Sequence, residues 1–512
     1  MTVAHPREKR INGDSGTILK IAKNSFFGLG GNVVTVLLRL AISIIIVRSF
    51  GADIYGTYIL SMTILEVTRM MALIGMENSV VKFVAEFKAL DDIPRLKGFI
   101  YSSMGISFIF SILLSLSLFL FSSLIVEKVF PIGGNVVMIK IMAASIPVSV
   151  VGRLCLSSLQ GMKHVKYKIF VFKILIPTAR LAMVIVTIHA GYLMAGIAWS
   201  YVLSEVAGLI YSIYVLVKNM PEIIQKTYTV FEVRKLVSFS TPMLFSGLFN
   251  TIIGKADVLL LAHYLPASMV GIYGLAQRLT PFIAFPLDSF NRIFAPIIAD
   301  LFARRKNIEL GIQFKMVTKW ILTASLPIFC LLTYFSKEIL AIMGPNFIFG
   351  SQAMIILCVS QLANSATGSV GYMLVMTGRP KANLWNSGIM CIINIILNIL
   401  LIPSFGIVGA AFATAFAVIA VQLLRLGEVW YFLKMHPYRN DIWKPVLSCL
   451  VSFLVIHSSD LIFVDINEIA RIMMFSIVFL ASYTGLLFLF KLSYEDRVTL
   501  YAIKKKLLHQ KR

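Results

Sequence analysis

The sequence has few charged side chains, and acids are the scarcer kind. Asp, Glu, Lys and Arg make up 14% of its 512 residues, with 24 acidic against 47 basic ones. Hydrophobic residues account for 58%, and the mean hydropathy is +0.86. A soluble chain of this length would form three or four domains with about 25% charged residues. The composition therefore excludes a soluble protein and indicates a polytopic helical membrane protein.

Several signals of enzyme chemistry are also absent from the sequence. It has no G-x-x-x-x-G-K-[ST] phosphate loop, so we expect no ATP hydrolysis by this chain alone. Its five cysteines fall within apolar runs and show no CxxC or Cys/His spacing, which predicts neither a disulfide nor a metal site. The short loops on one side hold no cluster of His, Asp and Glu for acid/base work. We therefore expect no enzyme and no cofactor.

Long apolar runs dominate the chain instead. A membrane-spanning helix needs about 20 mostly apolar residues. Fourteen such runs are present, and the predicted fold is an all-α polytopic membrane protein with about 14 transmembrane helices. The runs lie near 24–49, 56–80, 99–126, 138–160, 168–189, 193–217, 236–262, 269–299, 316–335, 352–377, 383–403, 406–430, 443–463 and 470–490. Residues 1–23 are polar and basic, so we expect no cleavable signal peptide.

Lysine and arginine are distributed unequally between the two sides of these runs. Segments on the side of the N-terminus hold 32 of them, whereas the opposite loops hold four. The positive-inside rule therefore predicts that both termini are cytoplasmic. The net charge of +23 then reflects topology and not nucleic-acid binding, and the basic tail at 491–512 is expected to contact lipid head groups.

An internal repeat relates the two halves of the chain. Residues 48–58 match 263–273 at three of eleven positions, and two shorter echoes are also displaced by about 215 residues, or six spans. An even displacement brings both copies into the membrane from the same side. Parallel repeats of this kind predict two six-helix lobes around a central cavity, at 24–217 and 236–430. We expect a cytoplasmic linker at 218–235 between them, and two further helices at 443–490.

Three segments carry a resemblance to a known family. The turn at 50–58, the run at 239–243 with Lys255 and Asp257 downstream, and the run at 395–411 resemble polysaccharide transporters of the multidrug/oligosaccharidyl-lipid/polysaccharide exporter superfamily. The resemblance covers most of residues 20–430. It implies a two-lobed flippase in the cell membrane that moves polyprenyl-diphosphate-linked oligosaccharides to the outer leaflet for surface polysaccharide biosynthesis. Membrane lipids and polysaccharide polymerases would be its partners.

Basic residues inside the apolar runs are the candidate cargo-binding groups. Each costs about 2.5 to 3.5 kcal/mol at the centre of a spanning helix, so such residues normally face a wet interior. A diphosphate carries about two negative charges, and arginine binds phosphate oxygens through paired hydrogen bonds. We therefore predict a cavity lined by Arg39, Arg69, Arg153, Lys173, Arg180, Arg278 and Arg292. The structural alternative is that these cations are paired within the protein: Arg180 with an acid on another span, Arg69 with Glu66, or Arg292 with Asp288.

Three acids inside the runs are candidates for cation coupling, namely Glu66, Glu205 and Asp257. Asp257 stands where the family that this chain resembles often has an acid in its seventh span. A packed pair between helices is the alternative for each of them. An inside-negative potential would drive an anionic head group outward by about 2.3 kcal/mol per charge per 100 mV, so voltage could replace ion coupling.

Other functions remain open at this level. A drug/cation antiporter of the same superfamily would place acids in its cavity, where basic residues outnumber acids here. A peptidoglycan-precursor flippase would share the cationic cavity. A membrane polysaccharide polymerase or ligase would need an external active site, which the short loops opposite the N-terminus do not provide.

Overall fold

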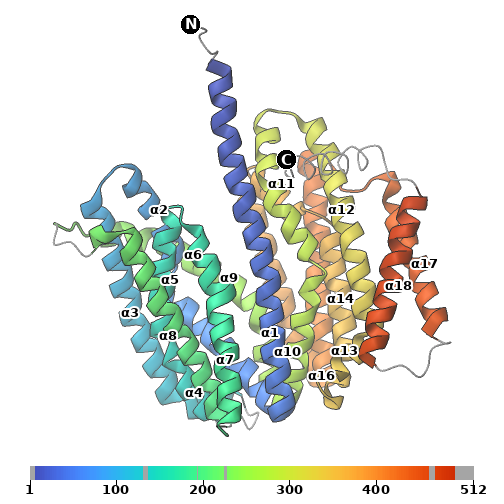
Figure 1. The fold of residues 1–512 in the computed structure, drawn as a ribbon, viewed down its shortest axis with the longest axis horizontal. Coiled ribbons are helices and arrows are strands. Elements are labelled where there is room, and N and C mark those ends of the chain that lie inside the picture. Colours follow the sequence, from blue (N-terminus) through green and yellow to red (C-terminus); the bar gives the residue numbers. More distant parts are fainter. Residues whose placement is uncertain (1–5, 131–135, 193, 224–227, 461–467, 491–512) are drawn as a thin grey trace. The chain divides into compact units, whose positions relative to one another are not determined.

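The computed structural model describes residues 6–130, 136–192, 194–223, 228–460 and 468–490 (Figure 1). Over this part of the chain the structure is helical and contains no strand. Helices satisfy every interior backbone hydrogen bond within one segment, which is why long apolar runs adopt them in a bilayer. The predicted fold class is confirmed. The predicted basic tail at 491–512 lies outside the described residues.

The chain divides into two compact units, and the first comprises Met1–Leu275 and Ser387–Ala413. Its helices are α1 (Pro6–Leu73), α2 (Met76–Ala89), α3 (Ile93–Leu124), α4 (Val136–Ala143), α5 (Ser145–Gly161), α6 (Val165–Phe170), α7 (Ile176–His189), α8 (Met194–Asn219), α9 (Val233–Tyr264), most of α10 (Ala267–Leu279) and the middle of α16 (Pro380–Leu433). Within it α5 packs on α2, α3 and α8, while α9 packs on α1.

The second unit comprises Ala276–Asn386 and Thr414–Arg512. Its helices are α11 (Phe285–Ala303), α12 (Asn307–Tyr334), α13 (Ser336–Ala341), α14 (Ser351–Ala366), α15 (Val370–Met376), α17 (Trp443–Asp460) and α18 (Glu468–Leu489), with the two ends of α16. The last two helices pack together and onto α12, where Phe475 and Phe479 share a core with Leu322 and Leu326. The Tyr483 hydroxyl adds a 2.9 Å hydrogen bond to the carbonyl oxygen of Thr323.

Two helices are too long to be single spans. The apolar part of α1, Val34–Leu73, has 40 residues and would extend about 60 Å, twice the thickness of the hydrocarbon core. It is interrupted at Gly51, where φ is 81°, and α16 is interrupted in the same way at Gly406, where φ is 57°. Glycine adopts positive φ without steric cost. Both breaks fall where two predicted runs adjoin.

The described residues contain ten helices that could cross a membrane, or twelve when each of two bent pairs counts as one span. One bent pair lies in α9, and the other joins α10 to α11. A multi-pass membrane protein is therefore confirmed, while the count of fourteen stays a prediction. The division into lobes at 24–217 and 236–430 also stays a prediction.

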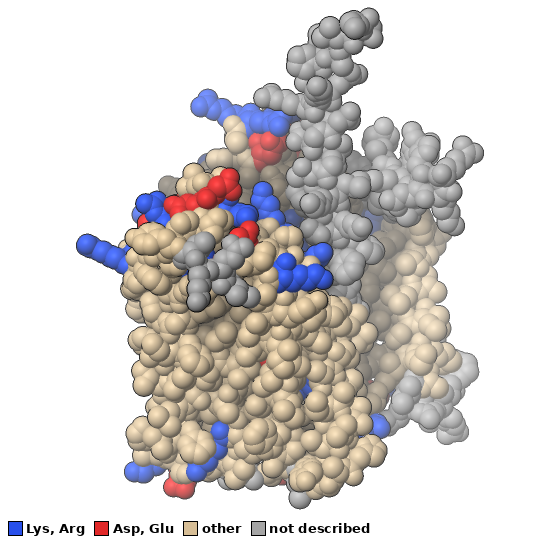
Figure 2. All heavy atoms as spheres, turned by 60° about the vertical axis from the view of Figure 1, so that its left-hand side comes forward, with Lys and Arg blue, Asp and Glu red and all other residues tan. Residues whose placement is uncertain are grey.

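In helix α3 apolar side chains are exposed and small polar ones are buried, which is the reverse of the pattern in a helix of a soluble protein. Its side chains Ile109, Leu113 and Leu120 are 57% to 63% exposed, whereas Ser107 and Ser111 are fully buried. The buried Ser111 hydroxyl donates to the carbonyl oxygen of Phe108, so this polar group is satisfied within its own helix. Figure 2 shows the result on the first unit as a broad uncharged band, with charged side chains gathered at its two ends.

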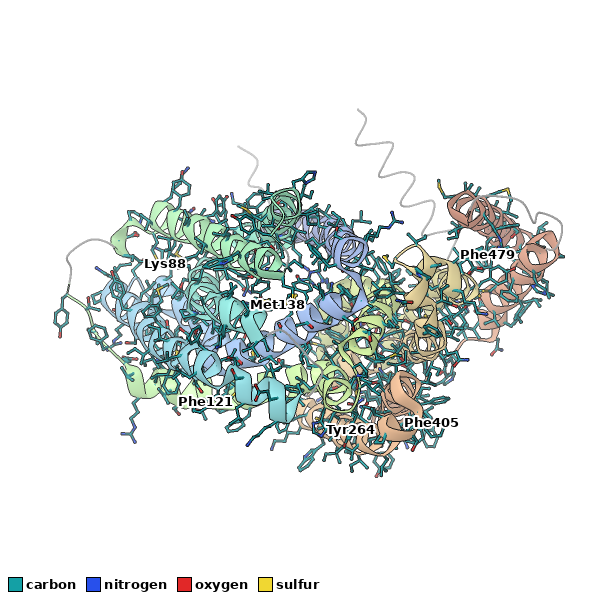
Figure 3. All side chains as sticks on the ribbon, turned by 90° about the horizontal axis from the view of Figure 1, so that it is seen from below. Lys88, Phe121, Met138, Tyr264, Phe405 and Phe479 are labelled. Atoms are coloured by element: carbon teal, nitrogen blue, oxygen red, sulfur yellow. The ribbon has the colours of Figure 1, made fainter. Side chains whose placement is uncertain are left out.

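Apolar side chains fill part of the interior of the first unit. Met138 of α4 is fully buried and lies among the surrounding helices in Figure 3, whereas Phe121 of α3 is 55% exposed and points outward. Charged side chains inside this unit therefore stand out against their surroundings. They define the site described next.

Candidate functional site

The first unit brings together five basic and three acidic side chains from seven helices. We call this group the cationic cluster. Its members are Arg69, Arg153, Lys168, Arg180 and Lys255, with Glu66, Glu77 and Glu205. The cluster carries a surplus of two positive charges.

Arg180 makes the best-formed ion pair of the cluster. Its Nη2 lies 3.0 Å from Oε1 of Glu205, and its Nε donates to the Ser204 hydroxyl at 3.1 Å. The guanidinium carbon also lies 4.0 Å from the centroid of the Tyr201 ring. The two charged side chains are 11% and 9% exposed. The alternative that Arg180 pairs with an acid on another span is therefore what the structure contains.

A widened turn precedes Arg180 in the same span. Residues Val171–Leu175 form one π-helical turn, and Pro177 follows in the first turn of α7. Proline has no N–H group to donate and tends to bend a helix, and π-turns often occur where the regular ladder is interrupted. Lys173 lies within this π-turn and is half-buried, and the carbonyl oxygen of Lys173 accepts a 2.9 Å hydrogen bond from the Thr35 hydroxyl.

Arg69 occupies the middle of the cluster. Its Nη1 lies 3.5 Å from the Tyr201 hydroxyl, and it interacts electrostatically with Glu66 and Glu205. The ion pair of Glu66 is made with Lys255 of α9, whose Nζ lies 2.9 Å from Oε2. The expected attraction between Glu66 and Arg69 is present, and a lysine side chain from another helix also makes an ion pair with this carboxylate.

Glu77 holds the remaining two cations of the cluster. Its carboxylate lies 3.2 Å from Nζ of Lys168 and 3.8 Å from Nη1 of Arg153. The Lys168 ammonium also donates to Gln160 at 2.9 Å. Sequence reasoning missed Lys168 and Glu77 because they stand at the ends of predicted spans, where charged residues are ordinary.

Three further predicted cargo-binding cations are Arg39, Arg278 and Arg292. Arg39 lies on α1 and is exposed. Arg278 is half-buried in the last turn of α10, and Arg292 is exposed on α11. Both of these belong to the second unit. A role for Arg39, Arg278 and Arg292 in cargo binding stays a prediction.

A second polar site surrounds Asp257 in the first unit. Its Oδ2 accepts a 2.7 Å hydrogen bond from the Tyr273 hydroxyl. Its Oδ1 accepts from the side-chain amides of Asn394 at 3.1 Å and Asn398 at 2.9 Å. All four side chains are at most 2% exposed. We call these four residues the Asp257 network.

The Asp257 network brings a hydroxyl and two side-chain amides to one buried carboxylate. The amide oxygen of Asn398 is fully buried and makes no hydrogen bond within the described part of the chain. A carboxylate with nearby amide oxygens is a typical ligand set for a hard cation. The signal that sequence reasoning passed over was the pair of asparagines four residues apart in an otherwise apolar run, since that spacing places them on one helix face.

Comparison with known proteins agrees with this architecture. The solved structure of the lipid II flippase MurJ, in an inward closed conformation, matches 94% of this chain and 100% of its own, with a TM-score of 0.72 at 16% identity. An identity this low shows a shared fold alone. A model of the MatE family matches residues 242–400.

Two curated relatives come from Haloferax volcanii. The probable low-salt glycan biosynthesis flippase Agl15 is 27% identical over 43% of this chain, and the probable flippase AglR is 24% identical over 77%. The chain spans about half the length of the first curated relatives it matches, 47% for Agl15, and 80% of AglR. The family model described as polysaccharide biosynthesis protein matches residues 21–302, more than half of the sequence. The chain belongs to the polysaccharide biosynthesis protein family.

Proposed function

We propose that this protein is a flippase that moves a polyprenyl-diphosphate-linked oligosaccharide from the cytoplasmic to the outer leaflet of the cell membrane, by alternating access of two lobes. Its family membership and the flippase names of its relatives support this assignment. The product would serve surface polysaccharide biosynthesis. Both termini would be cytoplasmic, as the distribution of lysine and arginine predicts.

The observation that carries the proposal is the excess charge of the cationic cluster. Its surplus of two positive charges matches the roughly two negative charges that a diphosphate brings. Guanidinium groups bind phosphate oxygens through charge-assisted hydrogen bonds about twice as strong as neutral ones. The carboxylates keep the cations from repelling one another when no cargo is bound.

Partial exposure makes the cluster suitable for exchange with a ligand. The side chains of Lys255 and Glu66 are 32% and 43% exposed, and that of Arg153 is 27% exposed. A diphosphate could therefore replace a carboxylate as the partner of these cations without unfolding a helix. The lipid chain need not enter the site, because hydrocarbon already surrounds the helices.

We propose that the Asp257 network couples transport to a monovalent cation. Of the three acids predicted for this role, Glu66 is paired with Lys255 and Glu205 with Arg180. Asp257 accepts hydrogen bonds from a hydroxyl and two amides, in a set of buried oxygen and amide groups of the kind that surrounds a small cation. Burial to 2% exposure keeps an organic cargo away from this carboxylate.

The net charge of the cationic cluster also bears on the other functions that the sequence left open. A drug/cation antiporter would need a net negative cargo site, and the cationic cluster is net positive. A peptidoglycan-precursor flippase would bind the same diphosphate, so the charge of the cluster does not distinguish it.

The test is a flipping assay in proteoliposomes with fluorescent polyprenyl-diphosphate oligosaccharide, a peptidoglycan precursor and a cationic dye as separate cargoes. We expect the first to move fastest, and we expect Arg69→Ala to slow it at least tenfold. Arg304→Ala is the matched control, since Arg304 is an exposed arginine paired with Asp300. Transport of the dye alone would refute the proposal. Equal rates for the two lipids would mean that the protein recognises the diphosphate and does not select the oligosaccharide.

A further inference from the structure

Two cysteines from distant parts of the sequence meet in the second unit. Cys330 lies on α12, one helical turn before this helix ends at Tyr334, and Cys449 lies on α17, 119 residues further along the chain. Their Sγ atoms are 3.0 Å apart, and both residues carry free thiols in this structure. A separation this long leaves no signature in a local sequence pattern, so only the packing of the two helices reveals the pair.

Helices α12 and α17 run side by side in the same direction. Just before α17 begins, Oδ2 of Asp441 lies 2.6 Å from Nζ of Lys319. Beyond the cysteines, the ring centroid of Phe453 lies 5.4 Å from that of Tyr334. An ion pair and an aromatic contact therefore flank the two thiols on either side and fix the register in which they meet.

Cys449 faces the turn of α12 that ends at Cys330. Its thiol donates a 3.8 Å hydrogen bond to the carbonyl oxygen of Leu326, four residues before Cys330 and on the same face of α12. The Cys449 side chain is 3% exposed and shares a core with Phe475 and Phe479 of α18. Cys330 is partly buried and packs against the same core. Both sulfurs are therefore held in contact by the surrounding side chains.

Only a small movement separates the two thiols from a covalent bond. A disulfide bond is about 2.0 Å long, so a shift of about 1 Å shared between the two side chains closes the gap. The flanking contacts already bring the two helices close together, so the bond requires no rearrangement of the fold.

We propose that Cys330 and Cys449 form a site of oxidative modification, at which a disulfide fastens α17 to α12. The oxidant is a peroxide, since hydrogen peroxide is small and uncharged and reaches a partly buried thiol inside a membrane protein. One sulfur attacks a peroxide oxygen, the O–O bond breaks, and a sulfenic acid and one water molecule form. The second thiol attacks the sulfenic sulfur and releases another water molecule. The two sulfurs give up two electrons in total, and both thiol protons end in water.

The disulfide acts on the two helices that follow the internal repeat. Helix α18 packs on α17 and reaches α12 through the hydrogen bond from Tyr483 to Thr323. A covalent link between α12 and α17 therefore fastens both helices to the second unit. It also restricts the unfolded chain, because it closes a long loop between the two cysteines. This inference is independent of the proposed transport function.

The test is a count of thiols after oxidation of the full chain in its membrane. Membranes are treated with hydrogen peroxide or with dithiothreitol, and the denatured protein is then labelled with a maleimide and mapped by mass spectrometry without reduction. We expect five labelled cysteines in the reduced protein and three after oxidation, with one cross-linked peptide that contains Cys330 and Cys449. Five labelled cysteines after oxidation, a disulfide between any other pair, or a sulfinic acid at Cys330 alone would overturn the proposal.

A matched pair of variants tests which cysteines react. Cys330→Ala should show four labelled cysteines after either treatment, whereas Cys358→Ala should fall from four to two on oxidation. Cys358 is the matched control because it is a fully buried cysteine of α14 in the same unit. Loss of two thiols from Cys330→Ala would contradict the assigned pair.

Thermal unfolding tests whether the disulfide fastens the helices. We expect oxidation to raise the melting temperature of the wild type by about 3 °C or more and to leave that of Cys330→Ala unchanged. Dithiothreitol should reverse the shift. A fully cross-linked wild type that melts at the temperature of the reduced protein would contradict the fastening. Neither measurement involves cargo, so a negative result here leaves the proposed transport function intact.

Discussion

Tyr58 and Tyr273 occupy equivalent positions of the internal repeat but face opposite charges. Tyr58 interacts with the Arg180 guanidinium, whereas Tyr273 donates a hydrogen bond to the Asp257 carboxylate. Both side chains are buried, at 3% and 0% exposure. Both copies therefore have a buried tyrosine at the same position, but its neighbour is a cation in the first copy and an anion in the second. The proposed roles, an anion beside the first copy and a small cation beside the second, rest on this difference.

The two surroundings also differ in how they balance their charge. In the cationic cluster, carboxylates pair with basic residues whose side chains are 11% to 32% exposed. In the Asp257 network, hydroxyl and amide groups solvate one carboxylate that is 2% exposed. Exposed pairs can exchange partners with a large anion, whereas a closed polar pocket can hold only something small. The predictions below test this contrast.

The largest effect is expected from Arg180→Ala. Removing one partner of a buried ion pair typically costs about 3 to 5 kcal/mol, and here it deprives Glu205 of the cation that lies 3.0 Å away. We expect a large fall in melting temperature and at least a tenfold fall in flipping, measured in detergent and in proteoliposomes. The double variant Arg180→Ala/Glu205→Ala should recover the melting temperature but not the flipping rate. Wild-type flipping by the double variant would make the pair purely structural.

A smaller and more selective effect is expected from Asp257→Asn. The amide keeps the shape of the side chain but cannot hold a proton or pair with a cation. We expect flipping without a gradient to change less than threefold, while acceleration by a sodium or proton gradient is lost. The measurement compares wild type and variant with each gradient in turn. If a gradient accelerated the variant as much as the wild type, the proposal that the Asp257 network couples transport to an ion would be contradicted.

The equivalent tyrosines allow a matched comparison of intermediate size. Losing a hydrogen bond to a charged group costs about 1.5 to 3 kcal/mol. We expect Tyr273→Phe to weaken the dependence on the coupling ion and Tyr58→Phe to weaken cargo binding. The measurement is the flipping rate of each variant as the concentration of coupling ion, and separately of cargo, is varied. The same change in both titrations for both variants would contradict a division of roles between the copies.

The smallest effect is expected from Arg304→Ala. Nε of Arg304 lies 2.9 Å from Oδ1 of Asp300, but the two side chains are 66% and 55% exposed. Exposed pairs four residues apart on a helix contribute about 0.3 to 0.5 kcal/mol. Melting temperature and flipping should both stay near wild type. A marked loss would show that charge anywhere in the protein matters, and would weaken the case for the cationic cluster.

Much of the fold was predictable because a bilayer imposes simple rules. Runs of about 20 apolar residues must become helices, and the glycines at 51 and 406 stand where two predicted runs adjoin. The sequence predicted a site made of basic side chains inside the membrane spans, but it did not predict all of the residues that form it. Arg69, Arg153 and Arg180 were named from the sequence, whereas Lys168 and Glu77 were not, because nothing in the local pattern separates them from ordinary residues at the ends of spans.

Composition and hydropathy alone determined that this is a helical membrane protein with an unusual number of cations in its interior, because those properties depend on residue type and spacing along one helix. Only the tertiary structure decided which charges meet. Glu66 pairs with Lys255 from a distant helix, and Asp257 is bound by Asn394 and Asn398. Each residue turns a helix by about 100°, so small differences in helix rotation select different partners, and no single-helix pattern contains that information.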